Sequence, residues 1–488
     1  MPSSPTRNKL VPFLGALAVA VVAILALPGC KEDPSIQPSD LTLLYTGNVH
    51  GYIEPCGCAA GQIGGIDRIA GYVEETLAEL GPRGLFIDTG DLLASGPPTE
   101  DMTVQQLRIK ARGFFEVWAE LGCSAIALGE AEVALGVREV AALADEFQVP
   151  MLCANVVDAQ GQSPLPDWVI VERGGLKVGV FSVLAGSLNE VAPKKKPVER
   201  KRYQVAKLLR AQGLTLEPWK ARAAEVIAEL RPQVDVLVCA SHLGYDNNVL
   251  LAEAHPELDM IVGGHFGSST GQTDVIAGTP VLTTRINGSR VGRMDWWLPN
   301  PSEYLANERG GVTGELVDAS SRAEAEIEHA VAIQAYSDLA GMERKYGTVE
   351  WERKLATQES MYELALERLR EADTIGEVNR FAHNQVPMHR GVTRSNEALA
   401  AVDEYHLATT AYWKARDAES PALGPHQRAF VGPENCTACH PEQVEFWLGT
   451  RHSRAFATLE ATSQAYDAEC IGCHTVGFQV QGGFDLPT

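Results

Sequence analysis

Two short cysteine motifs near the C-terminus constrain this chain more than any other feature. They read Cys436-Thr-Ala-Cys439-His440 and Cys470-Ile-Gly-Cys473-His474, two copies of C-x-x-C-H within one short segment. This spacing is the attachment signal for c-type haem, in which two thiols bond to one porphyrin and the adjacent imidazole reaches the iron. A four-thiol zinc ribbon also uses paired C-x-x-C motifs, but it needs no histidine after each second cysteine. The motifs therefore predict two haem c groups, attached at Cys436, Cys439, Cys470 and Cys473.

Four histidines are candidate axial ligands for the two irons. His440 and His474 are the proximal candidates, and His452 and His426 are near enough in sequence to complete two bis-histidine haems. No methionine follows Met388 in the chain. Ligation without methionine predicts low reduction potentials, and therefore electron transfer rather than oxygen chemistry. A solvated loop position is the alternative interpretation of His426.

The residues between the two motifs resemble the cytochrome c-552/4 family of multihaem electron carriers. Members typically read W-x-x-[ST]-x-H-x-x-A-F between haem motifs, and this chain has Trp447, Thr450, His452 and Ala455-Phe456 in nearly that arrangement. The resemblance covers about residues 430–478 and implies an electron carrier with closely spaced haems. The segment 426–488 is too short to build much core. We therefore expect a small cytochrome domain that depends on haem for its folding.

The N-terminus has the form of a bacterial export signal. Arg7 and Lys9 precede a mostly apolar run that ends in Pro28-Gly29-Cys30. A basic stretch, an apolar stretch and small residues before the cleavage point describe a secretory signal, and the ending resembles a lipobox, which implies a lipoprotein modified at Cys30. An uncleaved membrane anchor is the alternative. Both interpretations predict an extracytoplasmic protein held at a membrane, in the periplasm or on the cell surface, with a signal peptide at 1–29 and a tether at 30–40.

The 488-residue chain is acidic, with a formal net charge of −22. This charge argues against nucleic acid as a partner and favours basic redox partner proteins. One basic run, residues 193–202, reads as a solvated loop or as a contact for anionic lipid headgroups. The length allows two or three domains, and we predict them at 41–300, 301–425 and 426–488.

From Leu41 onward, apolar strand-like runs alternate with helical stretches, which is an α/β pattern. A helix is expected at 66–80, a hairpin at 168–183, and strands at 41–45, 84–88, 124–128, 234–238 and 258–262. Polar residues follow each of these five strands, where ligands gather in α/β sheets. Three imidazoles, two carboxylates and an amide suit a divalent transition metal. These candidate ligands are His50, His242, His265, Asp91, Glu130 and Asn48.

The order and spacing of these residues resemble the calcineurin-like metallophosphatases, especially the secreted 5′-nucleotidase branch, which includes sulfur-oxidation thiohydrolases. The family motifs D-x-H-G, G-G-x-x-R, G-D, G-N-H-E, x-H-x-G and G-H-x-H have counterparts between about residues 41 and 298. The resemblance implies a four-layer αββα sandwich in which two metals are bridged by the G-D aspartate, here Asp91.

Four positions depart from these motifs. The first aspartate of D-x-H is Asn48, and the last histidine of G-H-x-H is Gly267. The motif G-N-H-E reads Gly129-Glu130-Ala131-Glu132, so Glu130 replaces the family's asparagine ligand and Ala131 its catalytic histidine. No catalytic residue can therefore be assigned in this chain.

The departures predict one complete metal site and one degraded site. By the resemblance, the degraded site keeps His50 and Asp91 with the weak amide ligand of Asn48. Two-metal hydrolysis needs both ions, and a positioned acid or base adds roughly 10²–10⁴-fold. Ordinary 5′-nucleotidase activity is therefore not expected. The complete set for one divalent ion is Asp91, Glu130, His242 and His265.

Two further features leave alternatives open. Cys56 and Cys58 suit disulfides with Cys123, Cys153 or Cys239, as is usual outside the cytoplasm, or a soft ligand pair at the degraded site. Residues 301–425 favour a helical connector that spaces the haems or mediates dimerisation, with helices at about 320–373 and 396–416. The histidines of this interval are expected at the surface, with an approach to haem iron as the alternative: His383, His389 and His406.

Three functions agree with these features. The first is a membrane-tethered electron carrier whose divergent metallophosphatase-like domain binds a metal or an anionic small molecule. The second is a hydrolase of a phosphate, nucleotide or sulfur ester with accessory haems. The third is a redox enzyme in which metal and haem act on one substrate, such as a sulfur oxyanion.

Overall fold

The computed structural model describes residues 39–55, 63–94, 101–186, 205–265, 273–297, 317–318, 380–417, 433–478 and 484. Several features predicted from the sequence lie outside these ranges. They are Cys30, Cys56, Cys58, the basic run 193–202, Gly267, the helix expected at 320–373, and His426.

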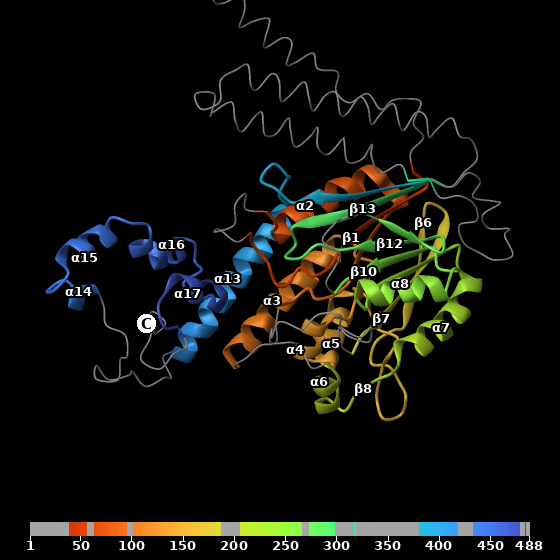
Figure 1. The fold of residues 1–488 in the computed structure, drawn as a ribbon, viewed down its shortest axis with the longest axis horizontal. Coiled ribbons are helices and arrows are strands. Elements are labelled where there is room, and N and C mark those ends of the chain that lie inside the picture. Colours follow the sequence, from red (N-terminus) through yellow and green to blue (C-terminus); the bar gives the residue numbers. More distant parts are fainter. Residues whose placement is uncertain are drawn as a thin grey trace, which may run out of the picture. The chain divides into compact units, whose positions relative to one another are not determined.

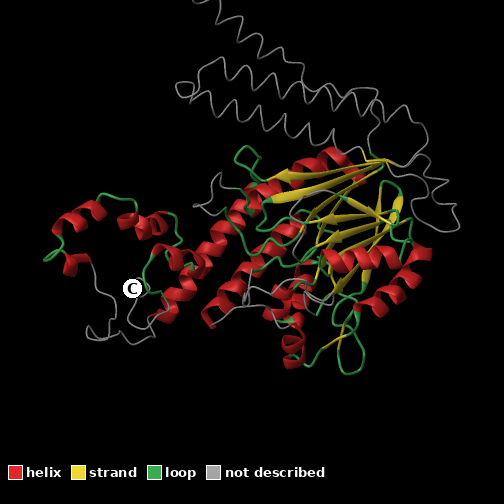
Figure 2. Ribbon diagram, in the orientation of Figure 1, coloured by secondary structure: helices red, strands yellow, loops and turns green. Residues whose placement is uncertain are grey.

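Two mixed sheets form the centre of the fold (Figures 1 and 2). In the first sheet, the strands β1 to β4 run parallel, and β13 and β15 extend it in antiparallel fashion. Its strands in spatial order are β14 (Val317–Asp318), β15 (Arg380–Pro387), β13 (Arg290–Trp297), β1 (Leu41–Thr46), β2 (Gly84–Asp88), β3 (Ala125–Ala127) and β4 (Met151–Leu152).

The second sheet has a parallel centre of β7, β9, β10 and β12, with antiparallel strands at both edges. Its strands in order are β11 (Asp274–Ile276), β12 (Thr279–Thr283), β10 (Met260–Gly263), β9 (Val236–His242), β7 (Leu176–Leu184) and β6 (Trp168–Arg173). A separate ribbon pairs β5 (Val156–Val157) with β8 (Thr215–Leu216).

Alternation along the strands divides the interior into three apolar layers. In β1, Leu43 and Tyr45 belong to the cluster between the sheets, whereas Leu44 belongs to the cluster beneath the first set of helices. In β7, Val180 lies between the sheets and Phe181 lies beneath the second set of helices. Successive strand residues point to opposite faces, so each sheet is covered on both sides. The predicted four-layer αββα sandwich is confirmed.

The helices of the two outer layers flank these sheets (Figure 1). α2 is amphipathic and buries Ile66, Ile69 and Val73 at helical spacing. The helices of the sandwich are α2 (Ile66–Leu80), α3 (Asp101–Glu120), α4 (Glu130–Leu135), α5 (Val137–Phe147), α6 (Val205–Ala211), α7 (Trp219–Leu230), α8 (Tyr245–Ala254) and α13 (Asn396–Asp417), with 3₁₀ turns at Gly81–Arg83 and Arg231–Gln233.

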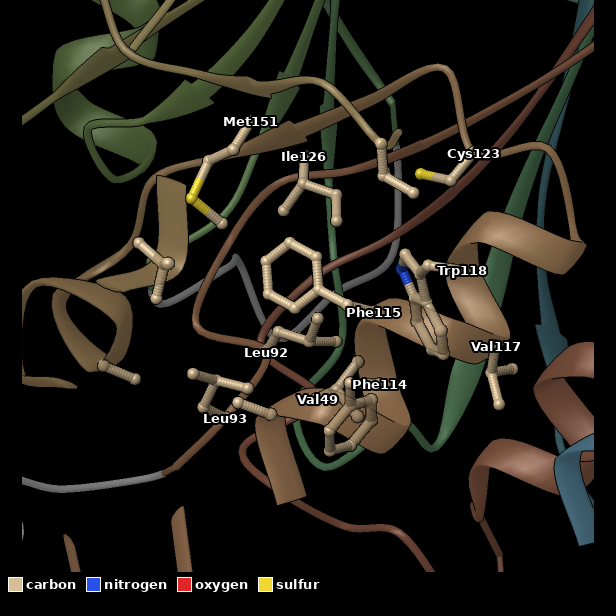
Figure 3. Close-up of a cluster of buried hydrophobic side chains, with 14 of the residues drawn as sticks. Val49, Leu92, Leu93, Phe114, Phe115, Val117, Trp118, Cys123, Ile126 and Met151 are labelled. Carbon is tan, nitrogen blue, oxygen red and sulfur yellow. The ribbon is translucent and has the colours of Figure 1, made fainter. Parts of the chain in front are cut away.

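Aromatic side chains of α3 fill the first helical layer (Figure 3). Phe114 and Trp118 meet edge to face, with ring centroids 5.5 Å apart, and both are fully buried. Figure 3 shows Phe115 beside Ile126 of β3. This packing fixes α3 against the sheet.

The predicted elements agree with the structure to within one or two residues at most boundaries. The helix at 66–80 and the strand at 84–88 have the expected bounds. The hairpin turns at Gly174-Gly175 as predicted. β9 runs to His242, so this histidine ends the strand rather than following it.

The interval expected to be a helical connector contributes a strand to the first sheet. β15 pairs along its whole length with β13, and α13 packs in the helical layer through Tyr405 and Val402. His383 and His406, expected at the surface, are only 3% and 6% exposed. His383 is buried because Tyr45 and Thr273 supply hydrogen-bonding partners, each 2.6 Å from a ring nitrogen.

The haem-motif segment is a series of short helices. They are α14 (Pro433–Cys436), α15 (Pro441–Leu448), a 3₁₀ turn (His452–Arg454), α16 (Ala455–Ala461) and α17 (Ala468–His474). Ile471 of α17 is fully buried with Leu459, Tyr466 and Trp413 of α13. Among the described helices, none is long and apolar enough to cross a membrane.

We predict that Phe381→Ala destabilises the sandwich strongly. Phe381 of β15 is fully buried in the cluster between the sheets, and truncating such a phenylalanine costs about 3–5 kcal/mol of unfolding free energy. Urea unfolding followed by circular dichroism measures the change. Leu407→Ala, at a position 67% exposed on α13, is the matched control and should have little effect. Equal, small effects of both variants would show that β15 does not contribute to the core.

Candidate metal centre and haem motifs

The predicted metal ligands come from the carboxyl ends of parallel strands in both sheets. Asp91 follows β2 and Glu130 opens α4 just after β3. His242 ends β9, and His265 follows β10. Both sheets direct these ends to the same edge, where ligands bind in α/β proteins.

Four of the six predicted ligands converge, and all four are at least nine-tenths buried. One ligand atom from each of Asp91, Glu130, His242 and His265 lies within 4.8 Å of the others. Glu130 bridges the two imidazoles, with Oε2 2.9 Å from His242 Nε2 and Oε1 2.7 Å from His265 Nδ1. Asp91 Oδ2 lies 3.4 Å from the same His242 Nε2. Two imidazoles and two carboxylates at this spacing form a buried metal-binding group that suits a divalent transition metal.

The carboxylates and imidazoles of this group strongly affect one another's pKa. Burial alone would raise the pKa of Glu130, but the hydrogen bonds and charges of His242 and His265 outweigh it and hold the pKa well below its ordinary value. Burial alone would lower the pKa of His242, but Asp91 and Glu130 raise it well above the ordinary value. The two carboxylates therefore need a compensating positive charge, either from protons on the imidazoles or from a bound cation.

Neighbouring groups orient the ligands. The carbonyl oxygen of Thr89 lies 2.7 Å from His242 Nδ1, which fixes the tautomer and leaves Nε2 facing the carboxylates. Asp91 Oδ1 accepts the backbone N–H of Ala131 at 3.0 Å. Both contacts hold a ligand side chain in the direction of the group's centre.

Glu132, which sequence reasoning passed over, organises the loops around the site. Its fully buried carboxylate accepts the backbone N–H groups of Asp91, Leu92, Leu93 and Gly129 at 3.0–3.2 Å. Burial and the Asp91 charge raise its pKa to about 8, against the amide N–H groups, which favour the charged form. It is the last residue of the stretch that corresponds to the G-N-H-E motif, which is the signal that could have revealed it.

Asn48 and His50 do not join the four-residue group. The Asn48 amide donates to Thr284 Oγ1 at 2.8 Å, and its oxygen accepts the backbone N–H of His265 at 2.9 Å. His50 Nδ1 lies 3.1 Å from Asn287 Oδ1. The amide of Asn48 therefore braces the His265 loop.

Four residues of this region adopt the left-handed backbone conformation that favours glycine. They are Asn48, His50, Asp91 and His265, with φ between 52° and 58°. Such residues cost of order 1–3 kcal/mol each and persist where the surroundings fix them. Here the fixing contacts are the loop hydrogen bonds of Glu132 and Asn48.

Ala131 occupies the position where the sequence resemblance implies a catalytic histidine. Its side chain is fully buried and packs in the first apolar cluster. The position therefore belongs to the core beside the site.

The three described cysteines of the sandwich behave as buried thiols. Cys123 and Cys153 lie in the first apolar cluster and Cys239 in the third, and none of them forms a disulfide with a described residue. Burial raises the pKa of each thiol, to about 12 for Cys153. These groups are inert at neutral pH, since the thiolate is the reactive form.

The two haem motifs differ in their surroundings. Cys436, Cys439 and His440 are exposed, and the N–H groups of Cys439 and His440 turn back to the carbonyl of Cys436. In α17 the second pair of thiols, Cys470 and Cys473, lies three residues apart on one helix face.

The histidines of this segment also differ in their surroundings. His474 Nδ1 lies 2.7 Å from the carbonyl oxygen of Ala455, which leaves Nε2 as the nitrogen suited to iron. His452 lies at the surface, in the 3₁₀ turn before α16. The described contacts bring neither His452 nor His440 to the second motif.

Known proteins resemble the two halves of the chain separately. Residues 435–488 match the family model "Cytochrome c554 and c-prime". Cytochrome c-554 of Nitrosomonas europaea is 29% identical over 72 residues, which cover 12% of this chain and 31% of that protein. The uncharacterized metallophosphoesterase YunD of Bacillus subtilis is 24% identical over 292 residues, covering 58% of this chain and 56% of YunD. The 5′-nucleotidase of Bos taurus is 25% identical over 299 residues, covering 57% and 47%.

The chain joins a metallophosphoesterase-like domain to a cytochrome c554-like segment. It spans about half the length of the curated metallophosphoesterase relatives that it matches. The 5′-nucleotidase-like domain carries the buried metal-binding group, and the cytochrome c554-like segment carries both C-x-x-C-H motifs.

We predict that the metallophosphoesterase-like domain binds one divalent ion per chain. Removing one of its four ligands, as in His265→Ala, should weaken binding at least tenfold, since even indirect contacts to metal ligands cost about 10–100-fold. Elemental analysis and calorimetric titration measure the stoichiometry and the affinity. His50→Ala is the matched control and should keep the ion. A stoichiometry of two ions, or equal losses in both variants, would contradict a single site.

Proposed function

We propose that this protein is an extracytoplasmic, membrane-tethered c-type cytochrome that transfers electrons and carries a mononuclear metal-binding domain. The observation that carries the proposal is the pair of C-x-x-C-H motifs within the segment that matches the cytochrome c554 family. When bound, haem supplies a one-electron carrier. The chain's own residues attach it, ligate it and limit its contact with solvent.

The described residues of the segment fit a porphyrin. Thiols at C-x-x-C spacing, with an adjacent imidazole, provide two thioether bonds and a proximal ligand per haem. Large apolar side chains nearby are exposed, among them Phe446 at 77%, Leu448 at 57% and Val476 at 71%. Exposed apolar groups in such a small segment favour a bound group that covers them.

The metal-binding domain supports a binding role better than a hydrolytic one. It gathers ligands for one ion, and the amide of Asn48 is held by Thr284 and His265. Two-metal catalysis requires a second ion to clamp the attacking and leaving oxygens. The role proposed here is to hold one divalent metal, at which an anionic small molecule could bind.

The location and partners follow from the sequence. A lipoprotein signal with Cys30 as the lipidated residue would tether the chain outside the cytoplasm, where c-type haem is attached in bacteria. The net charge of −22 favours basic redox partners through electrostatic steering.

We predict two low-potential haems per chain. Protein expressed with haem-attachment machinery should show a Soret band and two haems per chain, with potentials below those of histidine–methionine haems. Replacing Cys470 and Cys473 together by serine should leave one haem. Pyridine haemochrome analysis and redox titration provide the measurements. A colourless product, or one haem in the parent chain, would overturn the proposal.

A hydrolase with accessory haems is the second candidate. It is favoured by the similarity to proteins named 5′-nucleotidase and apyrase over more than half of the chain. The reaction would need water activation by the four-ligand site alone, without the imidazole that Ala131 replaces.

We predict slow turnover of nucleotides and of nitrophenyl phosphate by the metal-loaded protein. A positioned acid or base contributes roughly 10²–10⁴-fold, and the second metal set is incomplete, so rates should lie at least a hundredfold below ordinary enzyme rates. Phosphate release with each candidate metal measures this. Glu130→Gln provides the background level. Fast turnover that Glu130→Gln abolishes would establish the hydrolase instead.

A further inference from the structure

The second haem motif is attached to the sandwich by a cluster of polar side chains, here called the polar junction. It joins α3, α13 and the loop after His50 to the residues that precede α17. Its members are Glu54, Gln106, Tyr405, His406, Gln464 and Asp467.

Asp467 is the centre of the polar junction. Its side chain is buried, and the residue is 4% exposed. Oδ1 accepts the amide of Gln106 at 2.6 Å, and Oδ2 accepts the hydroxyl of Tyr405 at 2.9 Å. Gln106 also donates to the Tyr405 hydroxyl at 2.7 Å. Both carboxylate oxygens of Asp467 therefore act as acceptors.

The same residue begins the helix that carries the second motif. The backbone carbonyl of Asp467 accepts the N–H groups of Cys470 and Ile471 at 3.0 and 2.9 Å. Its negative charge therefore lies at the N-terminus of α17, where it stabilises the helix. Cys470 follows within one helical turn. The buried carboxylate is thus built into the attachment site of one haem.

A second contact joins the residues that precede α17 to the loop that follows His50. Glu54, four residues after His50, accepts His406 Nε2 at 2.9 Å and also accepts the amide of Gln464. Burial alone would raise the pKa of Glu54, but the hydrogen bonds of His406 and Gln464 lower it. The loop that begins at His50 therefore holds the chain three residues before Asp467. Cys436, Cys439 and His440 of the first motif are exposed.

We propose that Asp467 docks the second haem on the sandwich and lowers its reduction potential, so that the two haems are not equivalent. This inference rests on the proposed function, since it requires haem at both motifs. Ferric haem carries one more positive charge than ferrous haem, and a buried carboxylate stabilises the ferric form. Buried charges are weakly screened, so this carboxylate can act on a haem attached at α17. The second haem is then the inner site, next to the metal-binding domain, and the first haem faces redox partners.

Asp467→Asn tests this proposal in the full, haem-loaded chain. The substitution keeps the shape of the side chain and removes its charge. The reduction potential of one haem should rise by up to about 59 mV, which is a tenfold change in the equilibrium constant of a one-electron reduction. The reduction potential of the other haem should not change. Glu460→Gln, a charge removal at an exposed position of α16, is the matched control and should move neither transition. Asp467→Glu restores the charge and should restore the potential.

The outcomes separate this inference from the proposed function. Haem content is measured first, and a parent chain without two haems ends the proposed function and this inference together. Two haems with no shift in Asp467→Asn, or the same shift in Glu460→Gln, overturns the inference alone. Loss of one haem in Asp467→Asn but not in Asp467→Glu supports docking by the charge. Equal loss in both variants overturns it.

Discussion

A buried carboxylate shared by two imidazoles sets the charge balance on which the metal centre depends. Glu130 lies between His242 and His265, and Asp91 brings a second carboxylate to the same group. With neutral imidazoles the group holds two negative charges away from water, which is costly unless they are compensated. One divalent cation neutralises the group. Without a cation, protons on the imidazoles compensate the negative charge, which agrees with the raised pKa of His242. Protons and metal therefore compete for this site, and acid weakens metal binding.

The loops that carry the ligands are held by groups that never reach the metal. Asp91 and His265 adopt strained left-handed conformations, and Glu132 and Asn48 hold those conformations through backbone N–H groups. An amide suits the position of Asn48 because its nitrogen donates to Thr284 and its oxygen accepts the backbone N–H of His265. A carboxylate could only accept. The sequence resemblance implies an aspartate ligand at position 48, and the asparagine found there holds the loop of His265.

The sequence could predict the sandwich and the four convergent ligands because the signals are local. Each strand is a short apolar run followed at once by its polar residue, and the parallel strands bring these polar residues to the same edge of the sheet. The position of β15 could not be predicted in this way. Its central residues, His383 to Gln385, are polar, and they are buried only because distant groups such as Tyr45 and Thr273 supply partners. The exclusion of Asn48 and His50 has the same cause, since Thr284 and Asn287 already engage them. The polar junction joins residues more remote still in sequence, and no spacing rule connects Gln106 with Asp467.

Ala131, at the position where the sequence resemblance implies a catalytic histidine, is fully buried in the first apolar cluster. An imidazole at this fully buried position would have to displace neighbours of the first apolar cluster, and such overpacking costs about 1–3 kcal/mol. The backbone N–H of Ala131 meanwhile orients Asp91, so backbone shifts that admit a larger side chain would disturb a metal ligand. Apolar packing and ligand geometry therefore both disfavour a larger side chain at this position. The same sandwich gives α17 a buried polar seat at Asp467. A scaffold that combines the four-residue group with a seat for the helix of the second C-x-x-C-H motif agrees with the proposed function.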